Sequence, residues 1–304
     1  MTSRCDHAQR RESYKFGSES LWQCDTCGLI FLDKPVDPVS LYDDYYKNEM
    51  VGRFNRWLEY VVRIFRFFRT FKIFTLSPKA RSILDIGSGR GFMLYFLKKY
   101  YGYQRAAGTQ IAKKAFEFSR DKLGLEMYNK DLLEIPFEEK TFDIVSLWHV
   151  LEHIRNPECY IERIRKILRE KGKLIIEVPN FNSWTRYITG QYWLGLDLDY
   201  HIYFFTPVTL SNLLKKYGFK IRGIHTFSLE YSAFLSTQSL VSRLTRSDQL
   251  FYRRLQTGKI GWKLFPHILL FSVLMPICFI INVLLYFSQR GEVLLVIAEK
   301  PSGE

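Results

Sequence analysis

The sequence predicts an α/β fold built around a mostly parallel β-sheet. From Arg81 onward, short apolar runs alternate with longer helical patterns, which is typical of consecutive βαβ units. The first apolar run leads directly into a glycine-rich turn, Gly87-Ser88-Gly89-Arg90-Gly91. The 304 residues are 47% apolar and 25% charged, so the chain can bury a large core and is not expected to be disordered.

The alternation predicts individual elements. Strands are expected at 82–86, 105–109, 126–128, 142–148, 173–178 and 219–226, with helices between them at 92–101, 113–123, 157–168 and 206–217. The last helix has a clear start, because Thr206 can cap it and Pro207 occupies its first turn. A final apolar run over 292–298 predicts one more buried strand.

Charge and cysteine content narrow the class of protein. A formal net charge of +13 indicates an anionic partner, such as nucleic acid, acidic lipid or a phosphorylated substrate, without choosing among them. Residues 1–11 are polar, so we expect no secretory signal peptide. Only five cysteines occur, which disfavours a secreted disulfide scaffold and favours metal binding by paired cysteines in a reducing compartment.

The glycine turn predicts a ligand site. Glycines let the backbone turn sharply and let a ligand approach without interference from a Cβ, and the following helix presents free N–H groups. A dinucleotide fingerprint requires glycine or alanine where Phe92 stands. Asp85, two residues before the first glycine, instead suits a cationic ligand such as the methionyl ammonium of S-adenosylmethionine (SAM). A strand-turn-helix without a ligand is the structural alternative.

Several motifs make residues 83–219 similar to the class I SAM-dependent methyltransferases, especially the subgroup with Leu-Glu-His after the fourth strand. These motifs are LDIGSGRG, GTQIAKKAFEFSR, WHVLEHIRNP, GKLIIEVPN and HIYFFTPVTL. The resemblance covers roughly half the chain and implies a Rossmann-like sheet, SAM as cofactor and methyl transfer. The leading Cys-x-x-Cys segment and the closing hydrophobic block also resemble bacterial members that act on sugars or surface polysaccharides.

Carried over by position, the resemblance implies a set of SAM contacts. The pocket around methionine and ribose would comprise Asp85, Gly87, Ser88, Gly89 and Gly91. Gln110 stands where the family has an acid for the ribose hydroxyls, so we expect weaker SAM binding. Asp131 matches the acid that accepts from the adenine amino group, with Leu132 beside it, and Trp148 would lie near the sulfonium. Asp131 as a turn cap and Trp148 as ordinary core are the alternatives.

The second candidate cluster comprises His149, Glu152, His153 and the distant His201. Three interpretations remain open. A histidine acts as general base for a hydroxyl acceptor with Glu152 orienting it, because its pKa lies near neutrality. Alternatively, the set holds a divalent ion, as in the similar metal site of some RNA 2′-O-methyltransferases, or it only caps and packs the sheet edge. No Asn-Pro-Pro-Tyr motif follows the strand, which disfavours methylation of base amino groups.

The N-terminal cysteines predict a metal site. Cys24-Asp-Thr-Cys27-Gly28 has the spacing of a zinc knuckle, and Cys5 and His7 complete a set of three thiols and one imidazole. A closed set of four ligands indicates structural zinc. A redox pair and unliganded thiols are the alternatives.

Two apolar segments raise the question of a membrane. An apolar arc is opposed by arginines at 56, 63, 66 and 69; it comprises Phe54, Trp57, Leu58, Val61, Ile64, Phe65 and Phe68. This segment is either a membrane-surface helix or a helix packed on the core with a solvated basic face.

The uncharged segment Leu264–Phe287 is long enough to span a bilayer. A strand at 292–298 that returns to the sheet, however, requires both ends of this segment to lie on the same side of the membrane. A re-entrant hairpin broken at Pro266 and Pro276, a true span and a buried helix pair stay open.

These observations divide the chain into a zinc-ribbon-like segment (1–38), a basic helical segment (39–78), a SAM-binding domain (79–227), a hydrophobic helical insertion (228–290) and a final strand with its tail (291–304). We expect a SAM-dependent methyltransferase on the inner face of an anionic membrane, in the cytoplasm, that O-methylates a sugar of a lipid-linked or nucleotide-linked glycan. An RNA 2′-O-methyltransferase is the second hypothesis, and an inactive SAM-fold binding module is the third.

Overall fold

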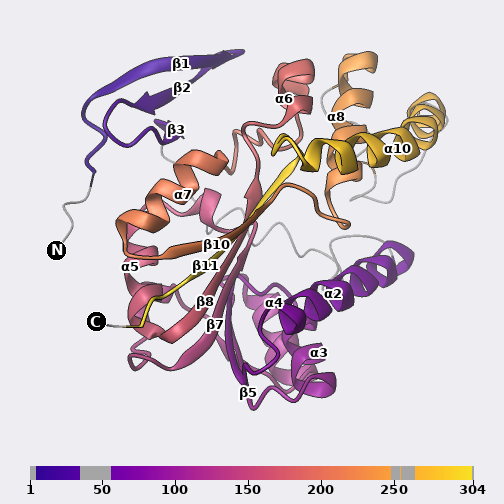
Figure 1. The fold of residues 1–304 in the computed structure, drawn as a ribbon. Helices are drawn as coiled ribbons and strands as arrows, with labels where there is room; N and C mark the ends of the chain where they lie inside the picture. The colour runs from indigo at the N-terminus through magenta and orange to yellow at the C-terminus, as the bar shows by residue number, and fades with distance from the viewer. Residues whose placement is uncertain (1–4, 35–55, 248–253, 255–263, 303–304) are drawn as a thin grey trace.

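The computed structural model describes residues 5–34, 56–247, 254 and 264–302, and of residues 56–59 the backbone alone. A seven-stranded sheet forms the centre of the molecule, and a small four-stranded sheet lies at one end (Figure 1). Phe54 lies outside the described residues, and so do the side chains of Trp57 and Leu58.

The central sheet has the strand order β10-β11-β8-β7-β4-β5-β6. Its strands are β4 (Ser82–Ile86), β5 (Arg105–Thr109), β6 (Glu126–Tyr128), β7 (Phe142–Trp148), β8 (Leu168–Pro179), β10 (Lys220–His225) and β11 (Val293–Glu299). Strands β4 to β8 pair in parallel, and β11 runs antiparallel between β8 and β10. The predicted Rossmann-like sheet and the return of the final strand are therefore confirmed.

Helices cover both faces of this sheet (Figure 1). On one face lie α2 (Arg56–Leu76), α3 (Phe92–Tyr100) and α4 (Lys113–Glu117), which continues as a π-helical turn over Phe118–Lys122. On the other face lie α5 (Pro157–Ile167) and α7 (Pro207–Lys216). Each face has its own apolar core, because β-strand side chains alternate between the two sides.

The small sheet joins the N-terminal segment to the main domain. Its strands are β1 (Arg10–Phe16), β2 (Glu19–Cys24), β3 (Ile30–Leu32) and β9 (Tyr203–Phe204), in that order. β3 pairs with β9, and the Leu32 amide also donates to the Ile202 carbonyl at 2.8 Å. The cysteine-containing segment is thus hydrogen-bonded to the chain that follows His201.

The insertion between β10 and β11 forms two packed helices, α8 (Ser232–Thr245) and α10 (Phe265–Tyr286). Of the described helices, only α10 is long and apolar enough to cross a membrane by length and composition. It stays continuous through Pro276, so the expected break there is wrong; proline removes only one hydrogen bond of a helix that packs along α8. Along α10 only Cys278 and Asn282 are buried, and half of its large apolar side chains are exposed.

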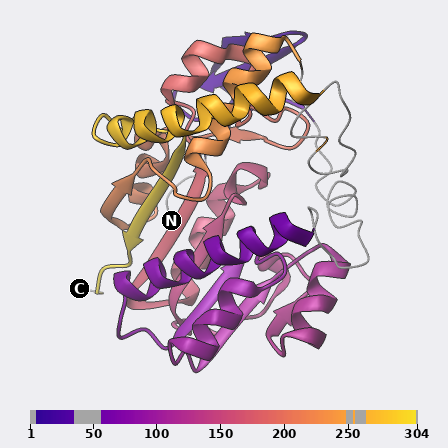
Figure 2. The same cartoon turned by 90° about the vertical axis from the view of Figure 1, so that its right-hand side faces the viewer.

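Short helical segments also connect these elements in the described parts of the chain. They are α6 (Trp184–Thr189) and the 3-10 turns Leu132–Glu134, Leu151–His153 and Gly190–Tyr192. Helices α2 and α10 lie on the same side of the molecule and both run across the face seen in Figure 2.

Helix α2 is amphipathic as predicted, but two of its arginines face inward and several of its apolar side chains face outward. Val61, Ile64 and Phe68 are exposed, whereas Arg66 is half-buried and Arg69 is buried. Both interpretations of this helix placed the arginines in water or among lipid headgroups, and that is wrong for these two. Their charges face the sheet because buried carboxylates meet them there.

Candidate functional site

The glycine turn between β4 and α3 has the backbone geometry that a ligand cradle needs. Gly87, Gly89 and Gly91 have φ of 69°, 57° and 69°, a left-handed conformation that favours glycine. A Cβ on Gly87 would lie 2.5 Å from Val150, so the loop after β7 packs against this turn. Gly91 precedes α3 without any side-chain cap, which leaves the first amides of that helix for a ligand. These residues fit SAM.

Asp85 lies beneath the turn at the end of β4. Its side chain is 4% exposed, and its Oδ1 accepts a hydrogen bond from the Ser146 hydroxyl at 2.6 Å. Burial raises the pKa of Asp85 to about 6, against the opposing effects of Ser146, Arg69 and Arg66. A cationic ligand group beside Asp85 would lower that pKa and favour the carboxylate.

The other residues predicted to bind SAM line the same edge of the sheet. The side-chain oxygen of Gln110 accepts from the Ala112 amide at 3.0 Å, and Ser88 lies 3.4 Å from the Thr109 carbonyl. Asp131 caps the 3-10 turn that begins at Leu132 by accepting from the Leu133 amide, and it also accepts from the Tyr160 hydroxyl. Asp131 is thus a turn cap, while its contact with adenine stays a prediction.

Beside the glycine turn, the segment after β7 carries the histidine cluster. His149 has φ of 55°, a strained conformation for a non-glycine residue that occurs mainly at functional sites. Its Nδ1 lies 3.5 Å from Glu152 and its Nε2 3.4 Å from Glu177. Burial alone would lower the pKa of His149, but these two carboxylates outweigh it and raise the pKa to about 10. His149 is therefore a cation at neutral pH and a poor proton acceptor.

Glu152, His153 and His201 converge next to it. The Nε2 atoms of both histidines lie 4.0 Å from Glu152 Oε1, and the two imidazole rings are 4.8 Å apart. Burial lowers the pKa of His153 and of His201, partly offset by the Glu152 charge, so both imidazoles are neutral near pH 7. The structure thus brings together all four residues predicted for this cluster and gives His149 a different charge from the other two histidines.

Three charged residues at this site were missed by the sequence analysis. Arg69 lies 2.5 Å from Glu230 and 3.7 Å from Glu177, and its guanidinium is 4.2 Å from the Trp148 ring. Glu177 offered a sequence signal, because it interrupts an apolar strand, whereas Glu230 offered none. Trp148 therefore carries an arginine on its face, and its indole Nε1 has no hydrogen-bond partner among the described residues.

The predicted zinc ligands form a compact cluster at the small sheet. The four ligand atoms of Cys5, His7, Cys24 and Cys27 lie within 4.8 Å of one another. Cys5 and Cys24 have their sulfur atoms 3.5 Å apart, and Cys27 Sγ lies 3.5 Å from His7 Nδ1. His7 reaches the cluster through a left-handed backbone, φ 55°, which compensates for the short Cys-x-His spacing. These ligands fit a tetrahedral zinc ion.

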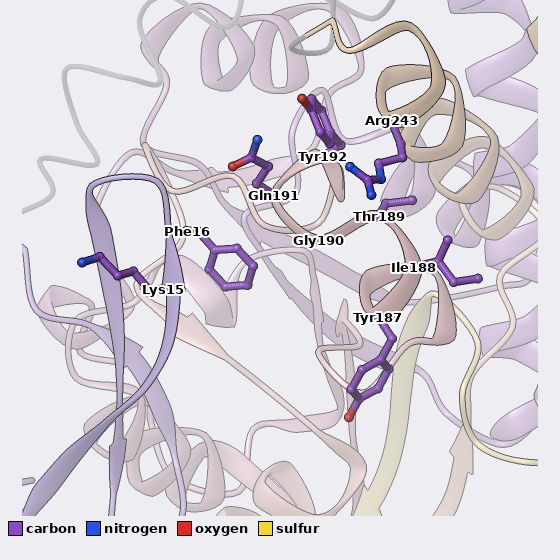
Figure 3. Close-up of a pocket in the computed structure, with 9 residues that line it drawn as sticks. All are labelled: Lys15, Phe16, Tyr187, Ile188, Thr189, Gly190, Gln191, Tyr192 and Arg243. Carbon is purple, nitrogen blue, oxygen red and sulfur yellow. The ribbon is translucent and has the colours of Figure 1, made fainter.

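A cavity of about 360 Å³ lies apart from both clusters, at the tip of the β1–β2 hairpin (Figure 3). Its lining residues come from β1, from α6 and the turn after it, and from α8: Lys15, Phe16, Tyr187, Ile188, Thr189, Gly190, Gln191, Tyr192 and Arg243. None of the residues predicted for the SAM, histidine or cysteine sites lines it, so it carries no part of the argument for methyl transfer.

Comparison with known proteins decides the family. Residues 53–223, more than half of the chain, match a family model described as a methyltransferase domain. The chain belongs to the class I SAM-dependent methyltransferase family. In this family SAM is expected at the carboxyl ends of the parallel strands, where the glycine turn after β4 lies. The histidine cluster lies directly beside that turn.

Three relatives illustrate the breadth of the match. Demethylmenaquinone methyltransferase of Thermotoga maritima is 24% identical over 56% of this chain and 79% of that protein. Ubiquinone biosynthesis O-methyltransferase of Coxiella burnetii is 23% identical over 56% of this chain and 77% of that protein. An uncharacterized protein of Methanocaldococcus jannaschii is 33% identical over 101 residues, and there the chain spans 42% of the relative.

A solved structure supports the same fold. The SAM-dependent methyltransferase from Archaeoglobus fulgidus aligns with a TM-score of 0.52 and 19% identity, covering 87% of this chain and all of that one. The agreement concerns the fold alone, because the identity is low.

Proposed function

We propose that the chain is an active SAM-dependent methyltransferase that O-methylates a sugar hydroxyl of a lipid-linked or nucleotide-linked glycan at the inner face of the cytoplasmic membrane. The observation that carries the proposal is the contact between the glycine turn and the segment of the histidine cluster. Val150, next to His149, packs on Gly87. A cofactor bound at the turn and an acceptor bound at the histidines would therefore be neighbours, as direct transfer requires.

The residues at the carboxyl ends of the parallel strands have the following proposed roles. Bound SAM supplies a methyl group on a sulfonium, an electrophile that needs no further activation. Asp85 and the glycine turn would hold its methionyl and ribose groups, and Asp131 with Leu132 would hold the adenine. The cluster of Glu152, His153 and His201 would promote loss of the acceptor hydroxyl's proton. His149 would hold Glu152 and Glu177 in place as their shared cation.

Exposed apolar surface supports membrane association. The outward faces of α2 and α10 carry Ile64, Phe68, Ile280 and Leu284, each at least 42% exposed. Both helices lie on the same side of the molecule (Figure 2). Exposed apolar side chains of this kind mark contact with a membrane or a partner, and amphipathic helices at the surface of a protein suit a monotopic arrangement.

The orientation of α2 also weighs against RNA as the acceptor. RNA binding at this helix would need exposed arginines, because phosphate contacts supply most of the affinity. Here Arg66 and Arg69 are engaged with Glu230, and Arg69 also with Glu177. These two arginines are therefore not available to bind phosphate, although the ion pairs leave the net charge of +13 unchanged.

We also propose that Cys5, His7, Cys24 and Cys27 bind structural zinc. A closed set of four ligands leaves no position for substrate. The ion would stiffen the segment that pairs with β9, directly after His201. Metal analysis of the purified chain should find zinc, with one equivalent per chain lost in Cys27→Ser, and zinc content unaffected by this substitution would contradict the assignment.

Calorimetric titration of SAM tests the cofactor half of the proposal. Asp85→Ala should abolish measurable binding, because it removes the carboxylate expected to hold the ammonium group. Asp121→Ala, at an exposed aspartate paired with Arg120, is the matched control and should bind as the wild type does. Failure of the wild type to bind SAM would overturn the proposal and favour an inactive binding module.

Flotation with vesicles of phosphatidylcholine and phosphatidylglycerol tests the membrane half. The wild type should float with the vesicles, and Ile280→Asp with Phe68→Asp should stay in solution. Val208→Asp is the matched control, since Val208 is 66% exposed on α7, on the opposite face of the sheet. Equal flotation of all variants would contradict a docking face made by α2 and α10.

A further inference from the structure

We propose that Glu152, His153 and His201 bind a divalent metal ion that holds the acceptor hydroxyl; the role in methyl transfer rests on the proposed function, whereas the binding itself does not. One carboxylate oxygen and two imidazole nitrogens, one from each histidine, lie within 4.8 Å of one another. The separation of 4.0 Å between Glu152 Oε1 and each Nε2 is too long for a hydrogen bond. It leaves room for an ion between the three atoms.

The two histidines are oriented as metal ligands are. His153 Nδ1 lies 2.9 Å from the Tyr200 carbonyl oxygen, and His201 Nδ1 lies 3.1 Å from the Gly195 carbonyl oxygen. A carbonyl only accepts, so each Nδ1 carries the proton and each Nε2 presents a lone pair toward Glu152. Metal-binding histidines characteristically donate their second ring nitrogen to a carbonyl or carboxylate, which fixes the ring.

Glu152 provides the independent observation that points to a cation. Its side chain is 1% exposed, and neither carboxylate oxygen has a hydrogen-bond partner among the described residues. A buried carboxylate without such partners is costly. The His149 ring lies 3.5 Å away and is shared with Glu177, so its charge offsets only part of that cost. A metal ion between Glu152 and the two Nε2 atoms would offset the rest of that cost.

The donor set selects the class of ion and of substrate. Two imidazoles and one carboxylate suit first-row divalent ions such as Mn²⁺ or Zn²⁺ and leave coordination positions open. A vicinal diol, as found in sugars, fills two such positions. Coordination makes the hydroxyl more acidic, so its proton is lost to solvent. The new O–CH₃ bond then forms as the S–CH₃ bond breaks and the thioether leaves. In this arrangement His153 and His201 act as ligands.

Manganese binding to the full chain tests the site without cofactor or acceptor. The protein is first stripped of metal, and one equivalent of Zn²⁺ then fills the cysteine cluster, whose soft thiolates prefer zinc. Mn²⁺ is titrated next, and electron spin echo spectroscopy detects nitrogen nuclei bound to it. We expect one Mn²⁺ per chain with couplings to two imidazole nitrogens.

Two variants and a control complete the experiment. Glu152→Gln and His201→Gln should weaken Mn²⁺ binding at least tenfold, whereas His225→Gln should bind as the wild type does, because His225 pairs with Tyr286 away from the cluster. Absence of saturable Mn²⁺ binding by the wild type, or binding without nitrogen coupling, would overturn the proposal. Equal affinity in Glu152→Gln would do so too. SAM binding is measured separately, so the metal site and the proposed function can fail independently.

Discussion

The two halves of the sheet edge are built in different ways. The cofactor half, at the ends of β4, β5 and β6, is centred on one backbone turn, in which positive-φ glycines form the cradle. The acceptor half collects charged side chains from distant segments: the turn after β7, β8, α2, the segment before β9 and the segment before α8. The first half depends on backbone shape, and the second depends on mutual compensation of buried charges. Substitutions should therefore separate cofactor binding from chemistry.

The largest effect is expected for the acceptor cluster. His201→Gln should lower turnover by roughly 10²- to 10⁴-fold, the range typical of removing a group that assists proton loss. SAM affinity should stay within about threefold of the wild type, because His201 lies outside the glycine cradle. Steady-state kinetics measure the turnover of this variant and calorimetry its SAM affinity. His225→Gln is the control for both measurements. A parallel fall of SAM affinity would show that the two halves are one site.

Next in size is the buried arginine of α2. Arg69→Met should lower the free energy of unfolding by up to about 3 kcal/mol, because it removes the buried guanidinium between Glu177 and Glu230 and leaves them only His149 and Arg66 as cationic partners. Urea denaturation measures the change. Arg120→Met removes an exposed pair with Asp121, which water and salt screen, and should leave the free energy of unfolding nearly unchanged. Equal destabilisation by the two substitutions would mean that α2 is not held by its buried charge.

A pH-dependent effect is expected at the start of β11. Burial raises the pKa of Glu292 to about 7, although Trp193 donates to it at 2.8 Å. Because the folded state binds this proton more tightly than the unfolded state, the stability that it contributes is fully present below about pH 4.5 and is lost as pH rises through 7. Glu292→Gln, which resembles the protonated form, should therefore stabilise the protein at pH 8 by up to roughly 3 kcal/mol and leave it unchanged at pH 4. Urea unfolding curves of the wild type and Glu292→Gln at pH 4 and pH 8 measure this difference. Equal stabilisation at both pH values would exclude titration of Glu292 as the cause.

The smallest effect concerns the cofactor half. Gln110→Glu restores a charged acceptor where the family has an acid, and a charge-assisted hydrogen bond exceeds a neutral one by about 1 kcal/mol. SAM affinity should rise about fivefold in calorimetry. Gln104→Glu, outside the glycine cradle, serves as control. Unchanged affinity in Gln110→Glu would place the ribose elsewhere.

The sequence predicted the cofactor half better than the acceptor half, for a physical reason. Strands β4 to β7 have the expected bounds, because apolar runs and glycines are local signals. The amphipathic pattern of α2 was also visible, but the face that packs inward depends on Glu177 and Glu230, which are remote in sequence. Likewise, no local pattern announced that β3 would pair with β9.

Within the acceptor half, residue types were predictable and their charges were not. The spacing of His149, Glu152 and His153 suggested a cluster, and in the structure the later His201 lies beside Glu152. Only the structure shows that Glu177 joins Glu152 in raising the pKa of His149, since the contact joins the residue after β7 to β8. The contacts that set these pKa values join residues that are distant in the sequence, so a single sequence does not reveal them.

Transfer of labelled methyl from SAM into host membranes would show whether the chain methylates a membrane glycan. Purified wild-type protein would be compared with Asp85→Ala, which lacks the cofactor carboxylate, and with Glu152→Gln, which lacks the acceptor carboxylate. We expect the wild type to label the lipid-extractable glycan fraction and neither variant to label it. Label in nuclease-sensitive material, or equal labelling by all three proteins, would contradict it.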